Sequence, residues 1–309
     1  MFLLSKRVRE SNIKVVITGE GADEMLGGYN IFKEAKVRRF WANQPDSKIR
    51  PRLLSKLYPY LPQLKDSSDF SLKMFFGYKL NEIDNPFYSH LLRWHNTSRL
   101  KSFFSSDFNA CILAGDPITE IQNKLPQKFN DWSLLAKSQY LESSIFMSEY
   151  LLSSQGDRMA MGNSVEGRYP FLDYRVIEFC AKLPDTYKLN ALNEKFILKK
   201  LSTGKIPDSI TKRTKQAYRA PISNSFFSNH GKRFMNEVLD EMKLDDSGIF
   251  DSKKIKTLIS RLQKQTIISE IDQMAITGII STQILHDKFI KNPIATNYSV
   301  LKNYRLIEE

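Results

Sequence analysis

The spacing of apolar and polar positions predicts a short strand followed by a long helical region in the first half of the chain. Residues 14–18, KVVIT, are dominated by β-branched residues and precede a glycine, which predicts a short buried strand. From Met25 the pattern turns helical toward Trp41. Residues 52–100 contain several short helical patterns interrupted by proline, and residues 105–131 are polar and turn-rich. We therefore expect a strand, a helix and then a helical insert.

The second half is predicted to be helical with one irregular stretch. An approximate apolar stripe predicts a helix from Trp132 to about Leu152. Helical patterns return at 174–183 and 193–203, and the chain then reads as mainly helical to about residue 290. The segment 267–289 is apolar on more than one face, which predicts a buried helix.

The junction VVITGEGADEMLGGY (15–29) gathers three carboxylates, those of Glu20, Asp23 and Glu24, where the predicted strand ends. Open α/β sheets bind ligands at this end of a strand, and the first amides of a helix favour anions. Carboxylates beside a phosphate fit a bridging Mg²⁺, and one of them could act as a general base. The alternative is a helix cap at Asp23 and a first-turn acid at Glu24. The pattern alone leaves both interpretations open.

Composition favours an anionic partner but not nucleic acid. The 309 residues carry a formal net charge of +12, which makes a phosphate-bearing ligand a reasonable expectation. The basic residues are dispersed, with clusters only at 33–40 and 211–219, and no nucleic-acid-binding module is visible. A solvated basic surface is the alternative.

Cysteine count and apolar runs indicate the compartment. Cys111 and Cys180 are too few for a disulfide scaffold or a four-cysteine zinc site. No uncharged apolar run of about 18 residues is present, and the first residues do not resemble a signal peptide. We therefore expect a cytoplasmic protein without a membrane span.

Two further stretches hold groups suited to phosphate or carboxylate. GDRMAMGNSVEGRYPFLD (156–173) mixes small residues with the charged side chains of Asp157, Arg158, Glu166, Arg168 and Asp173. These charges could contact a ligand, since arginine suits planar anions, or they could form an internal ion-pair network. KRTKQAY (212–218) could bring a lysine to a phosphate or be an exposed basic loop.

Together and in this order, VVITGEGADEMLGGY, GDRMAMGNSVEGRYPFLD and RTKQAYRAP resemble the synthetase domain of glutamine-hydrolysing asparagine synthetases. The resemblance covers about residues 1–225 and is weak in the helical tail. Tyr218 stands where that family usually has phenylalanine. The resemblance implies an α/β fold: the carboxyl-terminal part of a parallel-sheet domain of the adenine-nucleotide alpha-hydrolase type, mostly helical in this chain. Its domain would span 1–225 with the insert at 42–131, and 226–309 would be a helical extension.

The resemblance also implies the chemistry of a ligase for asparagine biosynthesis. ATP adenylates the side-chain carboxylate of aspartate, pyrophosphate leaves with Mg²⁺, and glutamine-derived ammonia attacks the acyl-adenylate. By resemblance Glu20 and Lys215 are the catalytic residues, Glu20 as the base and Lys215 as the cation that stabilises phosphoryl charge. Asp23 and Glu24 are expected at the metal. The expected cofactor-binding residues are Thr18, Gly19, Gly21, Arg158, Glu166 and Arg168.

Parts of the family pattern are missing. The Ser-Gly-Gly-x-Asp-Ser loop that grips pyrophosphate does not occur, and Phe2 stands where the family's glutaminase has its cysteine. We therefore expect the glutaminase and the pyrophosphate loop on a missing part or a separate chain, with a partial sheet here. Two alternatives stay open: a lactam- or peptide-cyclising synthetase with another acceptor amine, or an inactive truncated paralogue that serves as an interaction module.

Overall fold

The computed structural model describes most of the chain and divides it into two compact units. Unit 1 comprises Met1–His95 and Ile118–Tyr218, and unit 2 comprises Asn96–Pro117 and Arg219–Glu309. These units are defined by contacts within the structure, whereas the domain expected over 1–225 was defined by family resemblance. The family domain boundary therefore stays a prediction. The described residues are 1–61, 64, 67–112, 115–213, 215, 222–265 and 268–293.

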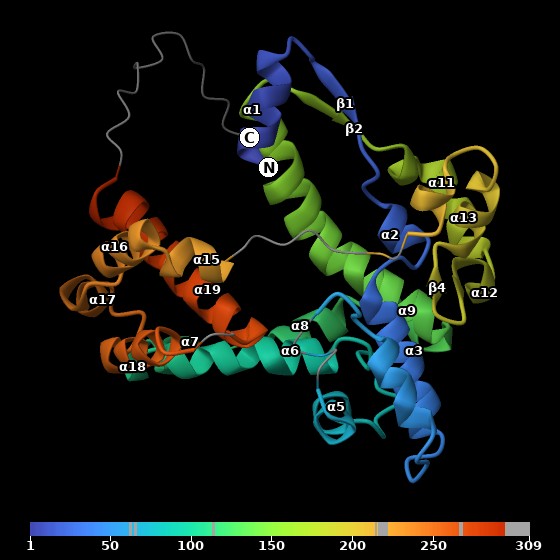
Figure 1. Cartoon of the computed structure of the whole chain (residues 1–309), viewed down its shortest axis with the longest axis horizontal. Coiled ribbons are helices and arrows are strands. Elements are labelled where there is room, and N and C mark those ends of the chain that lie inside the picture. The colour runs from blue at the N-terminus through green and yellow to red at the C-terminus, as the bar shows by residue number, and fades with distance from the viewer. Residues whose placement is uncertain are drawn as a thin grey trace, which may run out of the picture. The chain divides into compact units, whose positions relative to one another are not determined.

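A two-stranded parallel sheet joins two of the three sequence motifs. Strand β1 (Val15–Ile17) pairs with β2 (Glu166–Arg168), with Val16 opposite Gly167 (Figure 1). The amide of Thr18 continues the pairing by donating to the carbonyl of Arg168 at 3.0 Å. The predicted strand and the small sheet of a mostly helical α/β chain are therefore confirmed.

The prediction that this strand is buried is wrong. Val15 is 36% exposed and Ile17 is 75% exposed. A β-branched run reports strand propensity, whereas burial depends on what covers the two faces of the sheet. Within the described residues β2 is the partner of β1 in this sheet, and these apolar side chains remain open to solvent.

The helices next to the sheet carry further parts of the first and second motifs. Helix α1 (Phe2–Glu10) precedes β1, and α2 (Ala22–Met25) and α3 (Asn30–Ala42) follow it. Helix α9 (Leu134–Leu141) begins at Ser133, whose hydroxyl accepts from the amide of Ala136. It continues as the π-helical η4 (Glu142–Asp157) and α10 (Arg158–Met161), so the helix predicted over 132–152 extends further than its apolar stripe.

The other elements are short. The remaining elements of unit 1 are η1 (Arg50–Lys56), α5 (Asp69–Phe76), η3 (Phe129–Asp131), η5 (Pro170–Leu172), α11 (Tyr174–Lys182), α12 (Asp185–Lys188), the hairpin strands β3 (Leu189–Asn190) and β4 (Asn193–Glu194), α13 (Phe196–Ser202) and α14 (Asp208–Thr211). Helices α6 (Leu91–Ser98) and α8 (Pro117–Asn123) cross the unit boundaries. Unit 2 contains η2 (Arg99–Phe103), α7 (Ser106–Ile112), α15 (Ile222–Phe227), α16 (Asn229–Val238), α17 (Glu241–Ser247), α18 (Ser252–Leu262), α19 (Glu270–His286) and η6 (Asp287–Lys291).

Unit 2 has its own apolar core, to which α16, α17, α18 and α19 contribute. Met235, Leu244, Ile255 and Ile276 are fully buried in it. Helix α19 buries one stripe, whereas Leu285 on the same helix is 60% exposed. The prediction of a helix buried on more than one face therefore overestimated its burial.

The core of unit 1 contains a buried guanidinium that links three stretches of backbone. Arg38 is fully buried, and its nitrogens donate to the carbonyls of Phe76 (2.9 Å), Tyr78 (2.5 Å) and Tyr88 (3.4 Å). Its charge lies 3.9 Å from the buried carboxylate of Glu34. Such a group is stabilising only while all of its partners are present.

We expect Arg38→Met to lower the free energy of unfolding by about 3–5 kcal/mol, because it leaves three buried carbonyls without this donor and removes the cation beside Glu34, which keeps its hydrogen bond from the hydroxyl of Tyr58. Guanidinium unfolding followed by circular dichroism measures the change. Arg52→Met is the control, since Arg52 is exposed and should stay within about 0.5 kcal/mol of the parent. Equal midpoints for the two variants would contradict this role of Arg38.

Candidate active site

The turn between β1 and α2 has a backbone that requires glycine. Gly21 has φ +87°, a left-handed conformation that side chains with a Cβ avoid. A Cβ there would also lie 2.3 Å from a methyl group of Leu172, in the second motif. The turn therefore packs closely on the stretch that follows β2, and the next residues start α2 with their acids in its first turn.

The carboxylate of Asp23 lies between two lysines that come from distant parts of the sequence. Lys195 Nζ is 3.0 Å from Oδ1, and Lys215 Nζ is 2.8 Å from Oδ2. Lys215, which the family resemblance assigns to the same catalytic site as Glu20, thus contacts the GEGADE turn at Asp23. The other residues of the third motif, 214 and 216–221 with Tyr218, lie outside the described residues.

Lys195 was not predicted from the sequence. It has φ +49°, and its amide donates to the carbonyl of Leu26, so backbone and side chain both contact the segment that contains the turn. In the sequence it is one lysine in NEKF, at the start of a helix, with nothing to distinguish it from a surface residue. In the structure Lys195 is distinguished by its left-handed backbone conformation, which is uncommon for a residue other than glycine.

Glu194 anchors the backbone that carries both lysines. Its carboxylate is buried, 2.5 Å from Lys33 Nζ and 2.9 Å from Lys199 Nζ, and it accepts from the amide of Lys215 at 3.3 Å. Burial alone would raise its pKa, but the hydrogen bonds from Lys199 and Lys33 hold that pKa at about 2. Glu194 is therefore ionised at neutral pH.

Glu24 points into the protein, although the sequence grouped it with Asp23 as a metal ligand. It is 1% exposed and accepts a hydrogen bond of 2.6 Å from the hydroxyl of Tyr29. Burial raises its pKa, which the hydrogen bond from Tyr29 opposes. The amide of Gln139 donates to the carbonyls of Glu24 (2.5 Å) and Met25 (2.9 Å), satisfying acceptors at the end of α2.

Glu20 differs from the other two acids, because among the described residues its carboxylate has no hydrogen-bond or ion-pair partner. Burial, and then the charge of Asp23, raises its pKa, whereas Lys215 lowers it. A half-buried carboxyl with a raised pKa and a lysine nearby is typical of a proton-transfer group.

The backbone before Glu20 is open. Thr18 Oγ1 accepts from the amide of Glu20 at 3.4 Å, and a Cβ built on Gly19 would meet nothing within 4 Å. A ligand could therefore approach this backbone closely, as expected where a phosphate is bound. The assignment of Thr18, Gly19 and Gly21 to nucleotide binding stays a prediction.

Asp157, Arg158, Glu166 and Arg168 of the second motif are exposed. Arg168 Nε lies 2.7 Å from Glu166 Oε1 on β2, an arrangement that fits the ion-pair alternative. Arg158 is exposed on α10, and the carboxylate of Asp157 accepts from the hydroxyl of Tyr169 at 3.0 Å. The pairing of β2 with β1 brings this motif next to the GEGADE turn. A role of these side chains in shaping the pocket stays a prediction.

The donor set does not fit Mg²⁺ by itself. In the part of the chain that the structure describes, no three His, Cys, Asp or Glu side chains form a group able to hold a metal ion. Asp23 is neutralised by two lysines and Glu24 is bonded to Tyr29. Two accessible carboxylates beside lysines are too few for a cation that prefers six oxygen ligands.

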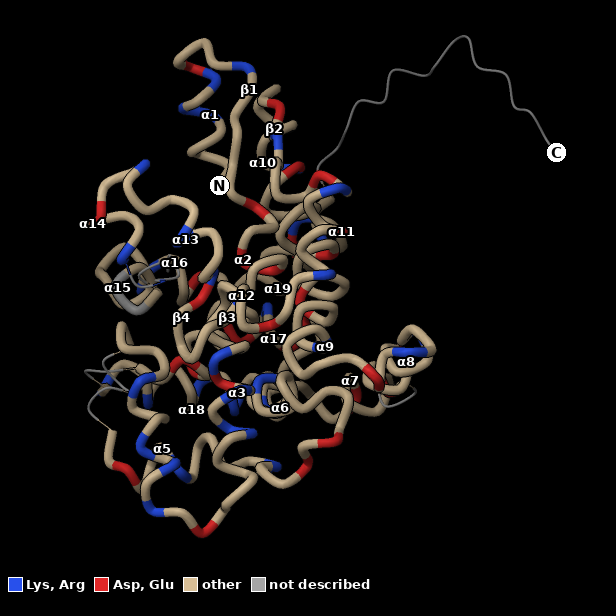
Figure 2. The backbone as a smooth tube through the Cα atoms, turned by 90° about the vertical axis from the view of Figure 1, so that its right-hand side faces the viewer, with Lys and Arg blue, Asp and Glu red and all other residues tan. Residues whose placement is uncertain are grey.

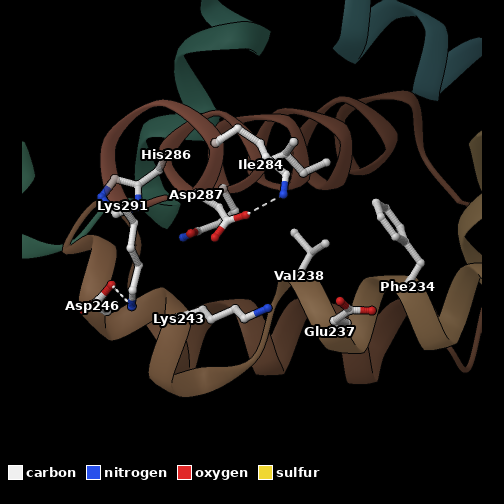
Figure 3. Close-up of a pocket in the computed structure, with 11 residues that line it drawn as sticks. Phe234, Glu237, Val238, Lys243, Asp246, Ile284, His286, Asp287 and Lys291 are labelled. Atoms are coloured by element: carbon white, nitrogen blue, oxygen red, sulfur yellow. Dashed lines mark hydrogen bonds and ion pairs between the residues drawn. The ribbon is translucent and has the colours of Figure 1, made fainter. Parts of the chain in front are cut away.

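A pocket of about 230 Å³ lies in unit 2 between α16, α17 and the α19–η6 segment (Figure 3). Its charged side chains largely pair with one another: Lys291 with Asp246 at 2.5 Å, and Lys288 with Asp287 at 3.3 Å. None of the predicted site residues lines it. We therefore place the candidate active site at the GEGADE turn of unit 1.

Comparison with known proteins now identifies the family. The profile of the Asparagine synthase family matches residues 1–286. The chain belongs to this family. Amidase chyE of Penicillium rubens is 29% identical over 240 residues, 71% of this chain and 34% of that protein. The glutamine-hydrolysing asparagine synthetase 1 of Bacillus subtilis is 23% identical over 259 residues, which are 79% of this chain and 36% of that protein. Asparagine synthetase 3 of the same organism is 28% identical over 206 residues, which are 66% of this chain and 26% of that protein.

This member of the asparagine synthase family therefore spans about a third of the length of the curated relatives it matches. The matched region includes the turn, Lys195 and Lys215, so the site is built from residues inside the family domain. None of the described helices is long and apolar enough to cross a membrane.

We expect Gly28→Ala to disrupt the site, because its Cβ would lie 1.9 Å from Oδ1 and 2.9 Å from Cα of Asp23. The second contact is to backbone, so rotation of the Asp23 side chain alone does not relieve it. The variant should lose about 1–3 kcal/mol of stability and displace Asp23 from the lysines. Thermal unfolding and a crystal structure of the variant measure the two effects.

Gly19→Ala is the matched control, since the space around Gly19 is open and its φ is not positive. It should unfold at a midpoint close to that of the parent protein. If both substitutions leave the midpoint unchanged, the close packing of Gly28 on Asp23 is not required for the turn.

Proposed function

We propose that this chain contributes the acyl-transfer side of an ATP-dependent amide synthetase that makes asparagine from aspartate and ammonia. The observation that carries the proposal is the pairing of Asp23 with Lys195 and Lys215. Beside it lies the carboxylate of Glu20, which has no hydrogen-bond or ion-pair partner among the described residues. Family membership supports ligase-type amide formation in general. Asparagine as the product is part of the proposal, as is a location in the cytoplasm.

The two lysines are proposed to hold the phosphate charge. Each ammonium has three donors, and a single hydrogen bond to Asp23 leaves donors for phosphoryl oxygens. Two positive charges against the Asp23 carboxylate leave one positive charge, which the Glu20 carboxylate balances when it is ionised. Preorganised cations stabilise charge that develops as pyrophosphate leaves, because they do not have to reorient during the reaction.

Glu20 is proposed as the base in the second half of the reaction. Ammonia attacks the carbonyl carbon of the aspartyl-adenylate, the new C–N bond forms, and the bond from carbon to the AMP oxygen breaks. The proton lost by the attacking nitrogen goes to the Glu20 carboxylate, and AMP leaves with the bonding electron pair. A base with a pKa raised above that of an exposed glutamate is better matched to this transfer.

The rest of the nucleotide site is proposed to come from residues beyond those matched here. The relatives are about three times as long as the matched region, and β1 exposes the apolar side chains of Val15 and Ile17. Further strands and helices of an adenine-nucleotide alpha-hydrolase-type domain would pair with this sheet, cover these side chains and supply the pyrophosphate loop. The glutaminase would also lie there. Any Mg²⁺ at the site would need ligands from this part, because Glu24 is bonded inside the protein.

A second acceptor chemistry is kept as an alternative because of the amidase relatives. Amidase chyE and amidase chry2 of Gibberella zeae are 29% and 27% identical over 71% of this chain. The described side chains around Asp23 and Glu20 suit any carboxylate activated by ATP, so they do not distinguish ammonia from another amine.

We expect Glu20→Gln to lower the rate by about 10²–10⁴ in the chain reconstituted with a polypeptide that carries the remaining family regions. Pyrophosphate release from ATP with aspartate and ammonium measures the rate. Glu178→Gln, which removes an exposed acid on α11, is the control and should leave the rate unchanged.

Full activity of Glu20→Gln would show that Glu20 is not the base. Robust turnover by the isolated chain would contradict the need for residues outside it. Release of pyrophosphate with a different amine but not with ammonium would favour the alternative acceptor.

The pH dependence provides an independent prediction for Glu20. The base must be deprotonated, so the rate should fall as the pH drops through its pKa. Because burial and Asp23 raise this pKa, the acidic limb of the kcat profile should lie above pH 4.5, the ordinary value for glutamate. The residual activity of Glu20→Gln should lack this limb. An acidic limb unchanged in the variant would assign the titration to another group.

A further inference from the structure

We propose that a groove on unit 1, between α3, the start of α9 and α12, binds a small organic anion with an apolar or aromatic body. The groove has a volume of about 420 Å³, within the range of small-molecule sites. None of Glu20, Asp23, Lys195 and Lys215 lines it, so it is separate from the candidate active site. Its apolar lining is Phe32, Leu134, Leu135 and Leu189.

The positive charge at the groove comes from successive turns of α3. Arg39 is exposed, and its guanidinium has no hydrogen-bond or ion-pair partner among the described residues. Lys36 Nζ donates to the carbonyl of Leu189 at 3.1 Å and has two further protons to donate. Burial lowers the pKa of Lys36, whereas the charge of Asp185 raises it.

One acid faces these cations, and part of its hydrogen-bonding capacity is already used. Asp185 Oδ1 accepts from the hydroxyl of Ser133 at 3.0 Å. Two cations against this carboxylate leave one positive charge, and the free guanidinium has the planar donor geometry that matches carboxylate or phosphate. The groove therefore favours an anionic head group near Arg39.

The body of the ligand is expected to be apolar or aromatic. Phe40 also lines the groove and is 44% exposed, with the guanidinium of Arg50 4.3 Å from the centre of its ring. An exposed phenylalanine beside an apolar floor gains stability when a ligand covers it. A ligand with its anionic head group at Arg39 and its ring against Phe40 would be an arylalkyl carboxylate or an aryl phosphate.

The floor of the groove is also the support of the GEGADE turn. A Cβ built on Gly27 would lie 3.7 Å from side-chain atoms of both Leu135 and Leu189. Helix α9 carries Leu135 and, one turn further, Gln139, which holds the carbonyls of Glu24 and Met25. A bound anion therefore contacts side chains that lie directly against the turn, although it does not enter the active site.

The test titrates the full 309-residue chain with 3-phenylpropanoate and with phenyl phosphate, followed by methyl NMR and calorimetry. Saturable binding at about 1–10 mM is expected for at least one probe, as for other ligands of this size. The shifted signals should come from Leu134, Leu135 and Leu189. The neutral 3-phenylpropanamide should bind about fivefold more weakly than its carboxylate.

Arg39→Gln should weaken the binding of the anion about fivefold without changing the affinity for the amide. Arg52→Gln removes an equally exposed arginine outside the groove and should leave both affinities within twofold. The proposal is overturned if neither probe saturates at 20 mM (about twice the weakest expected Kd). It is also overturned if the anion and the amide bind equally, or if Arg39→Gln and Arg52→Gln behave alike.

Discussion

The ion pairs of Asp23 with Lys195 and Lys215 are the interaction on which the site depends. They join a turn near residue 23 to segments that are 172 and 192 residues later in the chain. Each lysine is less than a quarter exposed, so these pairs are screened less by water than pairs on the surface. Glu194 adds a second tie, because it binds the amide of Lys215 and the side chains of Lys33 and Lys199.

The three acids of the turn have three different environments, although the first and the last are only four positions apart in the sequence. Helical spacing turns Glu24 inward to Tyr29 and directs Asp23 to the lysines, while Glu20 remains before the helix. Burial raises the pKa of Glu20, whereas Asp23 has two cations beside it. Neighbouring carboxylates in different environments are a common basis for dividing base and electrostatic roles.

Much of this arrangement could be predicted from the sequence, and the remainder depended on tertiary contacts. The strand at 15–17 and the helix after it follow from local signals, namely β-branched residues and glycine followed by acids. The approach of Lys215 to Asp23 was implied by the family motifs. Lys195 and Glu194 carry no local signal, because their roles arise from a left-handed residue and from burial created by other segments. The exposure of β1 was missed because sequence does not report which faces of a strand are covered.

Charge also has to be considered locally rather than as a total. The excess of 12 positive charges is spread along the chain, and Figure 2 shows Lys and Arg on many elements instead of in one stripe. The cations that matter at the turn are fixed by acids within the fold: Asp23 holds two lysines, and Glu194 holds two more. An acid that positions a lysine reduces the net local charge but removes the cost of ordering that side chain when an anion binds. The site therefore has less electrostatic attraction for an anion, but its lysines are already in place. Arg39 shows the opposite case, because no acid among the described residues pairs with its guanidinium and its full charge is available to an anion.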